Sequence, residues 1–219
     1  MNPLHPKAVI FDFDYTLADS TAPAYDCAGH ALTAMGLQTP PKAVVATTIG
    51  LSLTEAFHRM FPKEDRALAA EYYRLFIKRA DEVMVDGTVL FDWTPRAISA
   101  LHAHGMPLGI VSTKGRFRIE AILGRERLLD RFETIVGGED VPAFKPDPHG
   151  LLAALRRLDV PKGEALYVGD SLTYAETAKR ARVPFMAVLS GTTKRDEFNG
   201  YPVVEIIPSV AELPARLGW

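Results

Sequence analysis

Short apolar runs alternate along this chain with amphipathic stretches, and this alternation constrains the fold more than any other feature. The runs are rich in Val, Ile and Leu: Ala8–Phe13, Leu108–Ser112, Thr134–Val136, Ala165–Val168, Phe185–Leu189, and Val203–Ile207 as an expected edge strand. Such continuous apolar strands are typical of a parallel sheet that is covered on both faces. The pattern predicts an α/β fold, a Rossmann-like parallel sheet flanked by helices.

Helical periodicity fills the gaps between these runs. In the expected core it predicts helices at Pro95–His104, Arg116–Leu123, His149–Leu158, Ala175–Ala181 and Val210–Leu217. After the first run the alternation stops, and only helical stretches follow, at Ala24–Met35, Leu53–Phe61 and Arg66–Val85. We therefore predict an all-helical domain at residues 19–87, inserted into a catalytic core formed by residues 1–18 and 88–219.

Composition narrows the classes of partner. The formal net charge is −2, so no basic excess is available to bind nucleic acid or an anionic membrane. The single cysteine, Cys27, excludes an internal disulfide and fits a reducing compartment. No apolar stretch approaches the roughly 20 residues that cross a bilayer. We expect a soluble cytoplasmic protein, monomeric or homodimeric, that acts on a small molecule.

Two carboxylates, Asp12 and Asp14, end the first predicted strand. The alternation of a strand puts them on one side, at the carboxyl edge of the sheet where α/β proteins bind ligands. Carboxylates this close raise one another's pKa unless a cation lies between them. One could attack phosphorus while the other transfers protons. Alone, a D-x-D motif is more often a solvated turn.

Three further motifs follow predicted strands or precede helices. Ser112 and Thr113 end the second strand, where hydroxyls and helix N–H groups form an anion cradle, although Ser112 also suits a helix cap. Lys145 lies in the segment FKPDP, whose prolines restrict its backbone; it could hold a carboxylate and a phosphoryl oxygen, or be an ordinary exposed lysine. Asp170 could complete an oxygen-rich Mg²⁺ site with Asp12, or cap the next helix.

In this order, D-x-D-x-T, a hydroxyl after a strand, K-P and G-D after a strand resemble the four-motif signature of the haloacid dehalogenase-like hydrolases. The resemblance covers essentially the whole chain, and the helical insert resembles the C1 cap of that superfamily. Four segments resemble its phosphoglycolate phosphatase and pyrophosphatase branch: Gly109–Lys114, Ile49–Leu53, Val183–Phe185 and Ser190–Thr193.

The resemblance implies the roles of the central residues. Asp12 would be the nucleophile, and Asp14 the general acid/base, whose backbone carbonyl also binds Mg²⁺. Lys145 would anchor the phosphoryl group. Because true dehalogenases lack the second acid, the presence of Asp14 favours phosphoryl transfer.

The same resemblance implies the surrounding roles. Ser112 and Thr113 would bind the phosphoryl group that is transferred. Asp170 would bind Mg²⁺ together with the two acids of the first strand. Thr16 and Ser171 would support the loops that carry these residues.

Two residues depart from the family pattern. Tyr15 occupies a position that is usually glycine, which suggests tight backbone geometry. Tyr174 stands where a second acid is usual, four residues after Asp170. Glu176 does not replace that acid, because two helical residues turn it by about 200° to the far face. The loss predicts weaker Mg²⁺ binding without removal of a direct ligand.

The sequence thus predicts a Mg²⁺-dependent phosphatase acting on a small phosphorylated metabolite, phosphoglycolate first and pyrophosphate second. A mutase that returns phosphate to a sugar remains an alternative, since the chemistry up to the aspartyl-phosphate is shared. A non-catalytic member that binds a phosphorylated ligand is a third reading, supported by Tyr174 alone.

The helical insert offers contacts that the sequence does not rank. Candidate substrate contacts are Ser52, Arg59, Lys78 and Arg79. Aromatic residues expected in the core of the insert are Tyr72, Tyr73 and Phe76.

Overall fold

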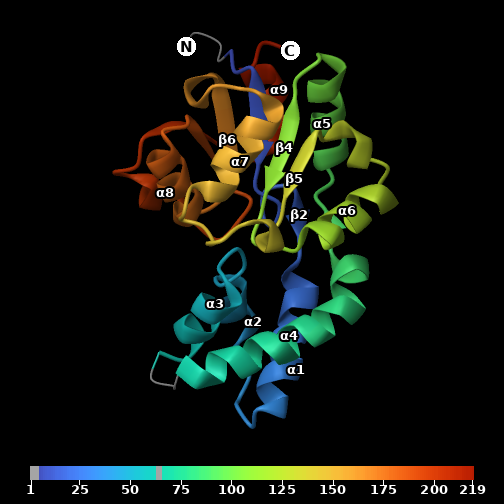
Figure 1. Cartoon of the computed structure of the whole chain (residues 1–219), viewed down its shortest axis with the longest axis vertical. Coiled ribbons are helices and arrows are strands. Elements are labelled where there is room, and N and C mark those ends of the chain that lie inside the picture. Colours follow the sequence, from blue (N-terminus) through green and yellow to red (C-terminus); the bar gives the residue numbers. More distant parts are fainter. Residues whose placement is uncertain (1–4, 63–65) are drawn as a thin grey trace. The chain divides into compact units, whose positions relative to one another are not determined.

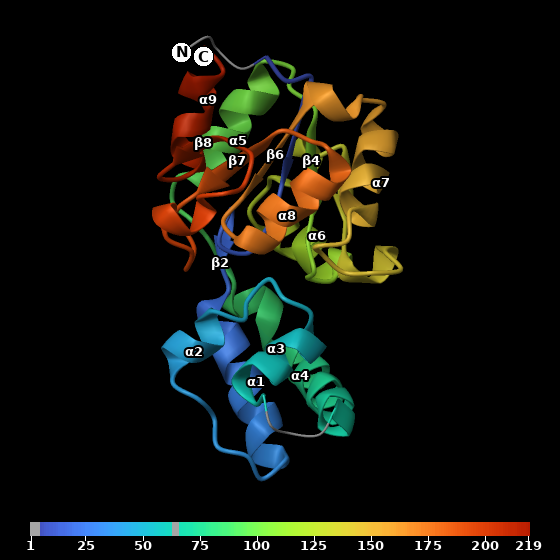
Figure 2. The ribbon, with the colours of Figure 1, turned by 90° about the vertical axis from the view of Figure 1, so that its left-hand side faces the viewer.

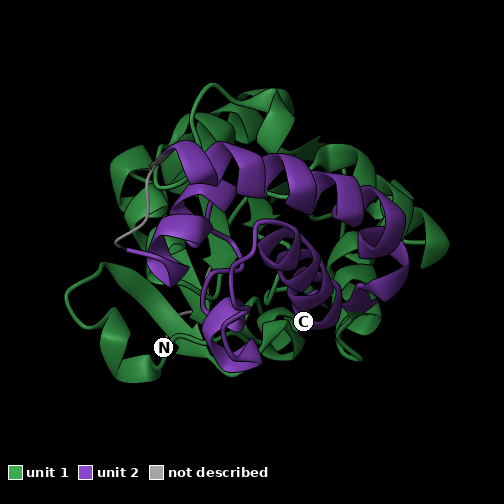
Figure 3. Cartoon of the chain, turned by 90° about the horizontal axis from the view of Figure 1, so that it is seen from below, with its two compact units in different colours: residues 1–18, 90–219 green, residues 19–89 purple. Residues whose placement is uncertain are grey.

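The computed structural model describes residues 5–62 and 66–219. The chain divides into two compact units: unit 1 comprises Met1–Ala18 and Leu90–Trp219, and unit 2 comprises Asp19–Val89. Figure 3 shows unit 1 in green and unit 2, which is built from helices, in purple.

A six-stranded sheet forms the centre of unit 1 (Figure 1). Its strands are β1 (Ala8–Phe11), β4 (Leu108–Val111), β5 (Thr134–Val136), β6 (Ala165–Gly169), β7 (Phe185–Val188) and β8 (Val203–Ile207). They lie in the order β5-β4-β1-β6-β7-β8, and every neighbouring pair is parallel. The predicted α/β fold with a parallel sheet is confirmed.

The strand order puts β1 between β4 and β6, where Ile10 is paired with Gly109 on one side and Tyr167 on the other. The chain reverses its direction of winding at this strand, because β4 and β5 lie to one side and β6 to β8 to the other. Ligands of open α/β sheets bind at such switch points, outside the carboxyl ends of the strands. Residues that directly follow β1 therefore lie at the favoured position for a site.

Helices cover both faces of the sheet. They are α5 (Thr94–Ala103), α6 (Arg116–Arg125), α7 (His149–Leu158), α8 (Leu172–Ala181) and α9 (Leu213–Arg216). Short 3₁₀ turns lie between them at Leu129–Arg131, Gly138–Asp140, Lys162–Glu164, Arg195–Phe198 and Val210–Glu212. Helices α7 and α8 pack on one face and on each other, while α5 and α9 lie together on the opposite side (Figure 2).

The face beneath α7 and α8 holds a continuous apolar core. Ile10 and Tyr167 project from the sheet into a buried cluster with Leu151, Leu155 and Ala178 from the two helices. Complete burial of an aliphatic side chain of this size stabilises a fold by about 1.5–3 kcal/mol. This packing fixes the ends of the strands that carry the site.

Unit 2 contains α1 (Thr21–Ala34), α2 (Lys42–Ala46), α3 (Leu53–Met60) and α4 (Arg66–Gly87). Cys27, Phe57, Tyr72 and Phe76 are buried in one cluster, in which the Phe57 and Tyr72 rings lie 5.4 Å apart. The expectation that Tyr73 belongs to this core is wrong, because Tyr73 is 48% exposed. One residue turns a helix by about 100°, so the neighbour of a buried residue points elsewhere.

Two short strands link the units. Strands β2 (Ala18–Asp19) and β3 (Val89–Leu90) pair as a separate two-stranded sheet. Next to them the Ser20 and Thr88 hydroxyls are hydrogen-bonded at 3.1 Å. Asp19 Oδ1 accepts a hydrogen bond from the Thr21 amide at 2.7 Å, which orders the start of α1. Both connections between the units are therefore joined to each other.

None of the helices in the described part of the chain is both long and apolar enough to span a membrane.

Candidate active site

Asp12 is the first residue beyond β1 and is wholly buried. Its amide donates to the Val168 carbonyl at 2.9 Å, which continues the pairing with β6. Its Oδ1 accepts a hydrogen bond of 2.5 Å from Lys145 Nζ. Within residues 5–62 and 66–219, Oδ2 is buried without a hydrogen-bond partner. A buried carboxylate oxygen of this kind calls for a ligand, because leaving it unsatisfied costs about 1–3 kcal/mol or more.

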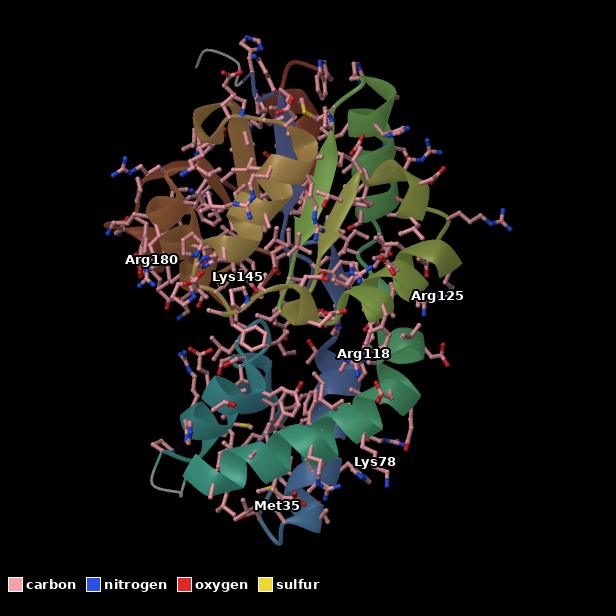
Figure 4. The ribbon with its side chains drawn as sticks, in the orientation of Figure 1. Met35, Lys78, Arg118, Arg125, Lys145 and Arg180 are labelled. Carbon is pink, nitrogen blue, oxygen red and sulfur yellow. The ribbon has the colours of Figure 1, made fainter. Side chains whose placement is uncertain are left out.

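Lys145 lies in the loop before α7 (Figure 4), and its ammonium pairs with the Asp12 carboxylate. The residue is 5% exposed, so the alternative of an ordinary surface lysine is wrong. Besides Asp12, its ammonium donates to the Val111 carbonyl at 3.0 Å and to the Tyr167 hydroxyl at 3.4 Å. The cation is thus held between the ends of β1, β4 and β6.

Burial governs the protonation of this cluster. It raises the pKa of Asp12, and the attraction of Lys145 opposes that shift. Burial likewise lowers the pKa of Lys145, against the attraction of Asp12. The pKa of Asp170 is raised well above its usual value, first by burial and then by the charge of Asp12. A cluster that resists carrying two negative charges is one that a bound cation would stabilise.

Asp14 lies just after Asp12, in an isolated bridge with Ala18 rather than within β1. Its Oδ1 forms an ion pair with Lys114 Nζ at 3.1 Å, and both side chains are nearly buried. Sequence reasoning assigned no role to Lys114. The available signal was its place, two residues after Ser112 in the loop that follows β4.

Ser112 and Thr113 begin the loop after β4. The Ser112 amide donates to the Val136 carbonyl at 3.0 Å, and its Oγ accepts from the Lys114 amide at 3.3 Å. Gly115, not Ser112, is the N-cap residue of α6, so the helix-cap alternative is wrong. Ser112, Thr113, Lys145 and Asp147 line a small pocket with apolar neighbours. Hydroxyls and a cation are thus brought to one hollow.

Asp170 follows β6 and is nearly buried. Ser171 is the N-cap residue of α8, so the alternative that Asp170 caps this helix is also wrong. Gly191, in the loop after β7, lies against the carboxylate: a Cβ there would come within 1.8 Å of Asp170 Oδ2. The loop can pass this close only with glycine; the sequence pointed to the segment Ser190–Thr193 but gave Gly191 no role of its own.

Tyr15 has a φ of 62°, in the left-handed region that glycine adopts most easily. For other residues this conformation costs roughly 1–2 kcal/mol. Hydrogen bonds hold the turn: the Tyr15 amide donates to the Ala18 carbonyl at 2.7 Å, and Ser190 Oγ donates to the Tyr15 carbonyl at 2.5 Å. The tight geometry suggested by the sequence is therefore present.

Thr16, expected to support the loop, is buried in the same turn. Its amide donates to the Phe13 carbonyl at 3.3 Å, while its hydroxyl finds no acceptor among the described residues. The support seen in the structure comes from the backbone of Thr16 and from Ser190, rather than from the Thr16 side chain.

The side chains around Asp12 offer oxygen ligands for a metal ion. No three acidic, histidine or cysteine side chains in the described residues are grouped so that they could hold an ion. The expected set needs only two carboxylates, those of Asp12 and Asp170, and one backbone carbonyl, that of Asp14. The unsatisfied Asp12 Oδ2 and the raised pKa of Asp170 fit a cation between them. Carboxylate and carbonyl oxygens suit Mg²⁺.

Several residues that the sequence offered as further site residues instead interact with structural partners. Glu176 pairs with Arg180 at 2.7 Å, as its place on the far face of α8 predicts. Ser52 forms a capping box with Glu55 at the start of α3. Arg79 pairs with Asp26 at 2.9 Å, within unit 2. Structural partners thus account for Ser52 and Arg79, and Arg59 and Lys78 remain as candidate contacts.

The comparisons with known proteins agree on one family. A family model described as haloacid dehalogenase-like hydrolase matches residues 9–188. Phosphoglycolate phosphatase of Escherichia coli K12 is 30% identical over 233 residues, covering 97% of this chain and 92% of that protein. That of Yersinia pseudotuberculosis is 30% identical over 189 residues, covering 84% and 82%. The structure of a haloacid dehalogenase-like hydrolase from Bacteroides fragilis is 39% identical, with a TM-score of 0.91, covering 95% and 99%.

Proposed function

The chain belongs to the haloacid dehalogenase-like hydrolase family, as its motifs predicted, and we propose that it is a Mg²⁺-dependent phosphatase that forms an aspartyl-phosphate on Asp12. It is a phosphoric monoester hydrolase, like the phosphoglycolate phosphatases it resembles. One observation carries the mechanism: Asp12 is buried, Lys145 fixes its Oδ1, and its Oδ2 has no hydrogen-bond partner among the described residues.

The reaction would proceed in two steps. The Asp12 carboxylate attacks phosphorus in line, and the bond from phosphorus to the leaving oxygen breaks while Asp14 donates a proton to that oxygen. Asp14 then takes a proton from water, whose oxygen attacks the aspartyl-phosphate. Inorganic phosphate leaves and the Asp12 carboxylate is restored. The proton that Asp14 gives to the leaving oxygen in the first step is thus replaced by the one that it takes from water in the second.

Other residues would bind the phosphoryl group and the metal. Lys145 and the hydroxyls of Ser112 and Thr113 would hold the phosphoryl oxygens, since Lys145 contacts Asp12 and the two hydroxyl residues directly follow β4, the neighbour of β1. The Asp12 and Asp170 carboxylates and the Asp14 carbonyl would hold Mg²⁺. A bound Mg²⁺ would offset the negative charge shared by these carboxylates and the phosphate. Ser171 would support the Asp170 loop as the N-cap residue of α8.

Phosphoglycolate is the first substrate to test, because the similar curated proteins are phosphoglycolate phosphatases; pyrophosphate is the second. Unit 2 would serve as a cap that selects the leaving group and excludes water. Arg59 and Lys78 are its remaining candidate contacts. A cytoplasmic location and a monomer or homodimer stay predictions from the sequence.

The deciding experiment is a phosphatase screen with purified protein. Phosphate release from phosphoglycolate, pyrophosphate, sugar phosphates and p-nitrophenyl phosphate is measured after exhaustive treatment with EDTA, and again after Mg²⁺ is added back. We expect no turnover without the metal and recovery with it, because three carboxylates would otherwise repel the substrate. Full activity after chelation would refute the metal assignment.

The same screen separates the two alternatives. A mutase would convert a sugar 1-phosphate to its isomer without releasing phosphate. A non-catalytic binding protein would bind an ester without turning over any of them, with or without Mg²⁺.

A further inference from the structure

Tyr174, in the first turn of α8, lies against the ammonium of Lys145. The residue is 1% exposed, and Lys145 Nζ lies 3.9 Å from the centroid of its ring. The ring makes an edge contact with Tyr167, at 6.3 Å between centroids and 69° between planes. Tyr167 in turn accepts a hydrogen bond from Lys145. Two tyrosines thus surround one buried cation, one through its hydroxyl and the other through its face.

The hydrogen bonds of Lys145 show what the ring adds. An ammonium has three N–H donors, and they are directed to Asp12, the Val111 carbonyl and Tyr167. A phosphoryl oxygen could be bound only if one donor leaves its partner, and the bond to Tyr167, at 3.4 Å, is the longest. The ring of Tyr174 attracts the cation without using a donor. It can therefore hold Lys145 while a donor changes partner.

The surroundings make this contact strong. The attraction between a cation and an aromatic face is stronger when both are desolvated, and Lys145 is nearly buried. The Tyr174 hydroxyl lies near enough to Asp12 to lower the pKa of that carboxyl, but it is the smallest of the causes that act on this pKa. No hydrogen bond of ordinary geometry reaches Asp12 Oδ2 from the described residues. The ring face, rather than the hydroxyl, is the principal contact.

The neighbouring strand β6 ends in a glycine that makes room for the Tyr174 ring. A Cβ on Gly169 would lie 2.7 Å from Cδ2 of Tyr174, a separation that real Cβ atoms do not reach. Glycine at the end of β6 therefore leaves the space that the ring fills. A carboxylate in place of the ring would compete for a Lys145 donor and add a fourth acidic group to the three already present.

We propose that Tyr174 is a positioning residue for Lys145, whose ring holds the phosphate-anchoring ammonium beside Asp12 while its donors turn to the substrate. This inference rests on the proposed function and deepens it. It assigns the residue that departs from the family pattern to binding the anion, not to binding the metal.

Two substitutions separate the ring from the hydroxyl. Tyr174→Phe keeps the aromatic face, and Tyr174→Leu replaces it with a smaller aliphatic side chain. With Tyr174→Leu we expect inhibition by inorganic phosphate to weaken by roughly 10- to 30-fold, with a matching loss of kcat/KM. Tyr174→Phe should restore both to within about threefold of wild type. A Tyr174→Leu enzyme that binds phosphate as well as wild type would overturn the proposal, and so would a Tyr174→Phe enzyme as impaired as Tyr174→Leu.

A double-mutant cycle tests the contact without any assay of activity. Tyr174→Leu, Lys145→Met and the double variant are unfolded with urea in metal-free buffer. If the ring and the ammonium attract one another, the shift in midpoint caused by Tyr174→Leu is smaller in the Lys145→Met background. Strictly additive shifts would contradict the proposal. Coupling in a protein that hydrolyses no ester would refute the phosphatase while leaving the contact intact. Should Lys145→Met fail to fold, the Phe and Leu comparison of phosphate binding by calorimetry still decides.

Discussion

Two lysine–aspartate pairs lie at the carboxyl edge of the sheet, and they are held differently. The pair of Asp12 and Lys145 is almost sealed, with side chains 1% and 4% exposed, and three strands surround it. The pair of Asp14 and Lys114 belongs to two loops, is longer at 3.1 Å and keeps 9% and 6% exposure. A nucleophile benefits from a single fixed geometry, whereas a residue that exchanges protons with the leaving group and with water needs access to both.

The largest expected effect lies in the sealed pair. Asp12→Asn should abolish turnover, lowering kcat by at least about 10⁴-fold, because the amide cannot form the covalent intermediate. The fold should survive, since Asn has nearly the same shape and its oxygen can still accept from Lys145. Phosphate release and circular dichroism measure the two outcomes. A variant with a near wild-type rate would make the mechanism wrong.

The looser pair should give a smaller and selective loss. Asp14→Asn should lower kcat by about 10²- to 10⁴-fold on alkyl phosphates, the usual contribution of a general acid/base. p-Nitrophenyl phosphate has a leaving group that needs little protonation, so its first step should proceed and its second stall. Stopped-flow absorbance should then show a burst of p-nitrophenol. Equal losses on both substrates, without a burst, would assign Asp14 to binding rather than proton transfer.

A third test asks whether position 174 affects the binding of Mg²⁺ as well as the binding of the phosphate anion. Tyr174→Asp should lower the Mg²⁺ concentration for half-maximal rate by roughly 10- to 100-fold, the usual range for a residue that orients metal-bound water. Tyr174→Asn, of similar size but neutral, is the matched control and should leave that concentration nearly unchanged. Identical Mg²⁺ titrations for wild type and Tyr174→Asp would show that the absent acid has no consequence here.

The smallest expected effect is on stability. Burial raises the pKa of Asp170 above its value in the unfolded chain. The folded protein thus holds a proton that the unfolded chain releases, and stability falls as pH rises through the folded-state pKa. Asp170→Asn cannot ionise, so its melting temperature in EDTA should gain on that of wild type as pH rises. A chain of this length shifts by about 2–4 °C per kcal/mol.

Added Mg²⁺ should reverse this order by stabilising only the wild type. A difference between the two proteins that does not vary with pH would contradict the raised pKa. A difference that Mg²⁺ does not alter would remove Asp170 from the metal site.

The local pattern of apolar residues was sufficient to predict the strands that carry the site. The apolar runs predicted the strands of the main sheet, because a buried parallel strand needs continuous hydrophobic residues. Asp12 and Asp170 could be placed because each lies at the carboxyl end of such a run. Helix α2 was not predicted, since five residues, Lys42–Ala46, are too few to show a helical period. Strands β2 and β3, of two residues each, gave even less signal.

The partners of these residues could not be read from the sequence. Lys114 meets Asp14 across 100 positions of the chain, and Ser190 meets the Tyr15 carbonyl across 175. Such pairs depend on how loops from different strands converge, and no periodicity encodes that. The contact of Tyr174 with Lys145 is of the same kind. The sequence marked Tyr174 as an exception, but only the packing of α8 against the strand ends gives it a partner.

Both chain connections to unit 2 run through the paired strands β2 and β3. The chain enters unit 2 at Asp19, in β2, and leaves at Val89, in β3, and these two strands pair with each other. The six-stranded sheet therefore needs no part of unit 2 to complete its hydrogen bonds. An engineer could exchange everything between these two strands for another helical insert, keeping the Ser20–Thr88 hydrogen bond as the junction. Selection on substrate range could act in the same way, changing unit 2 while the acids and lysines of unit 1 stay as they are.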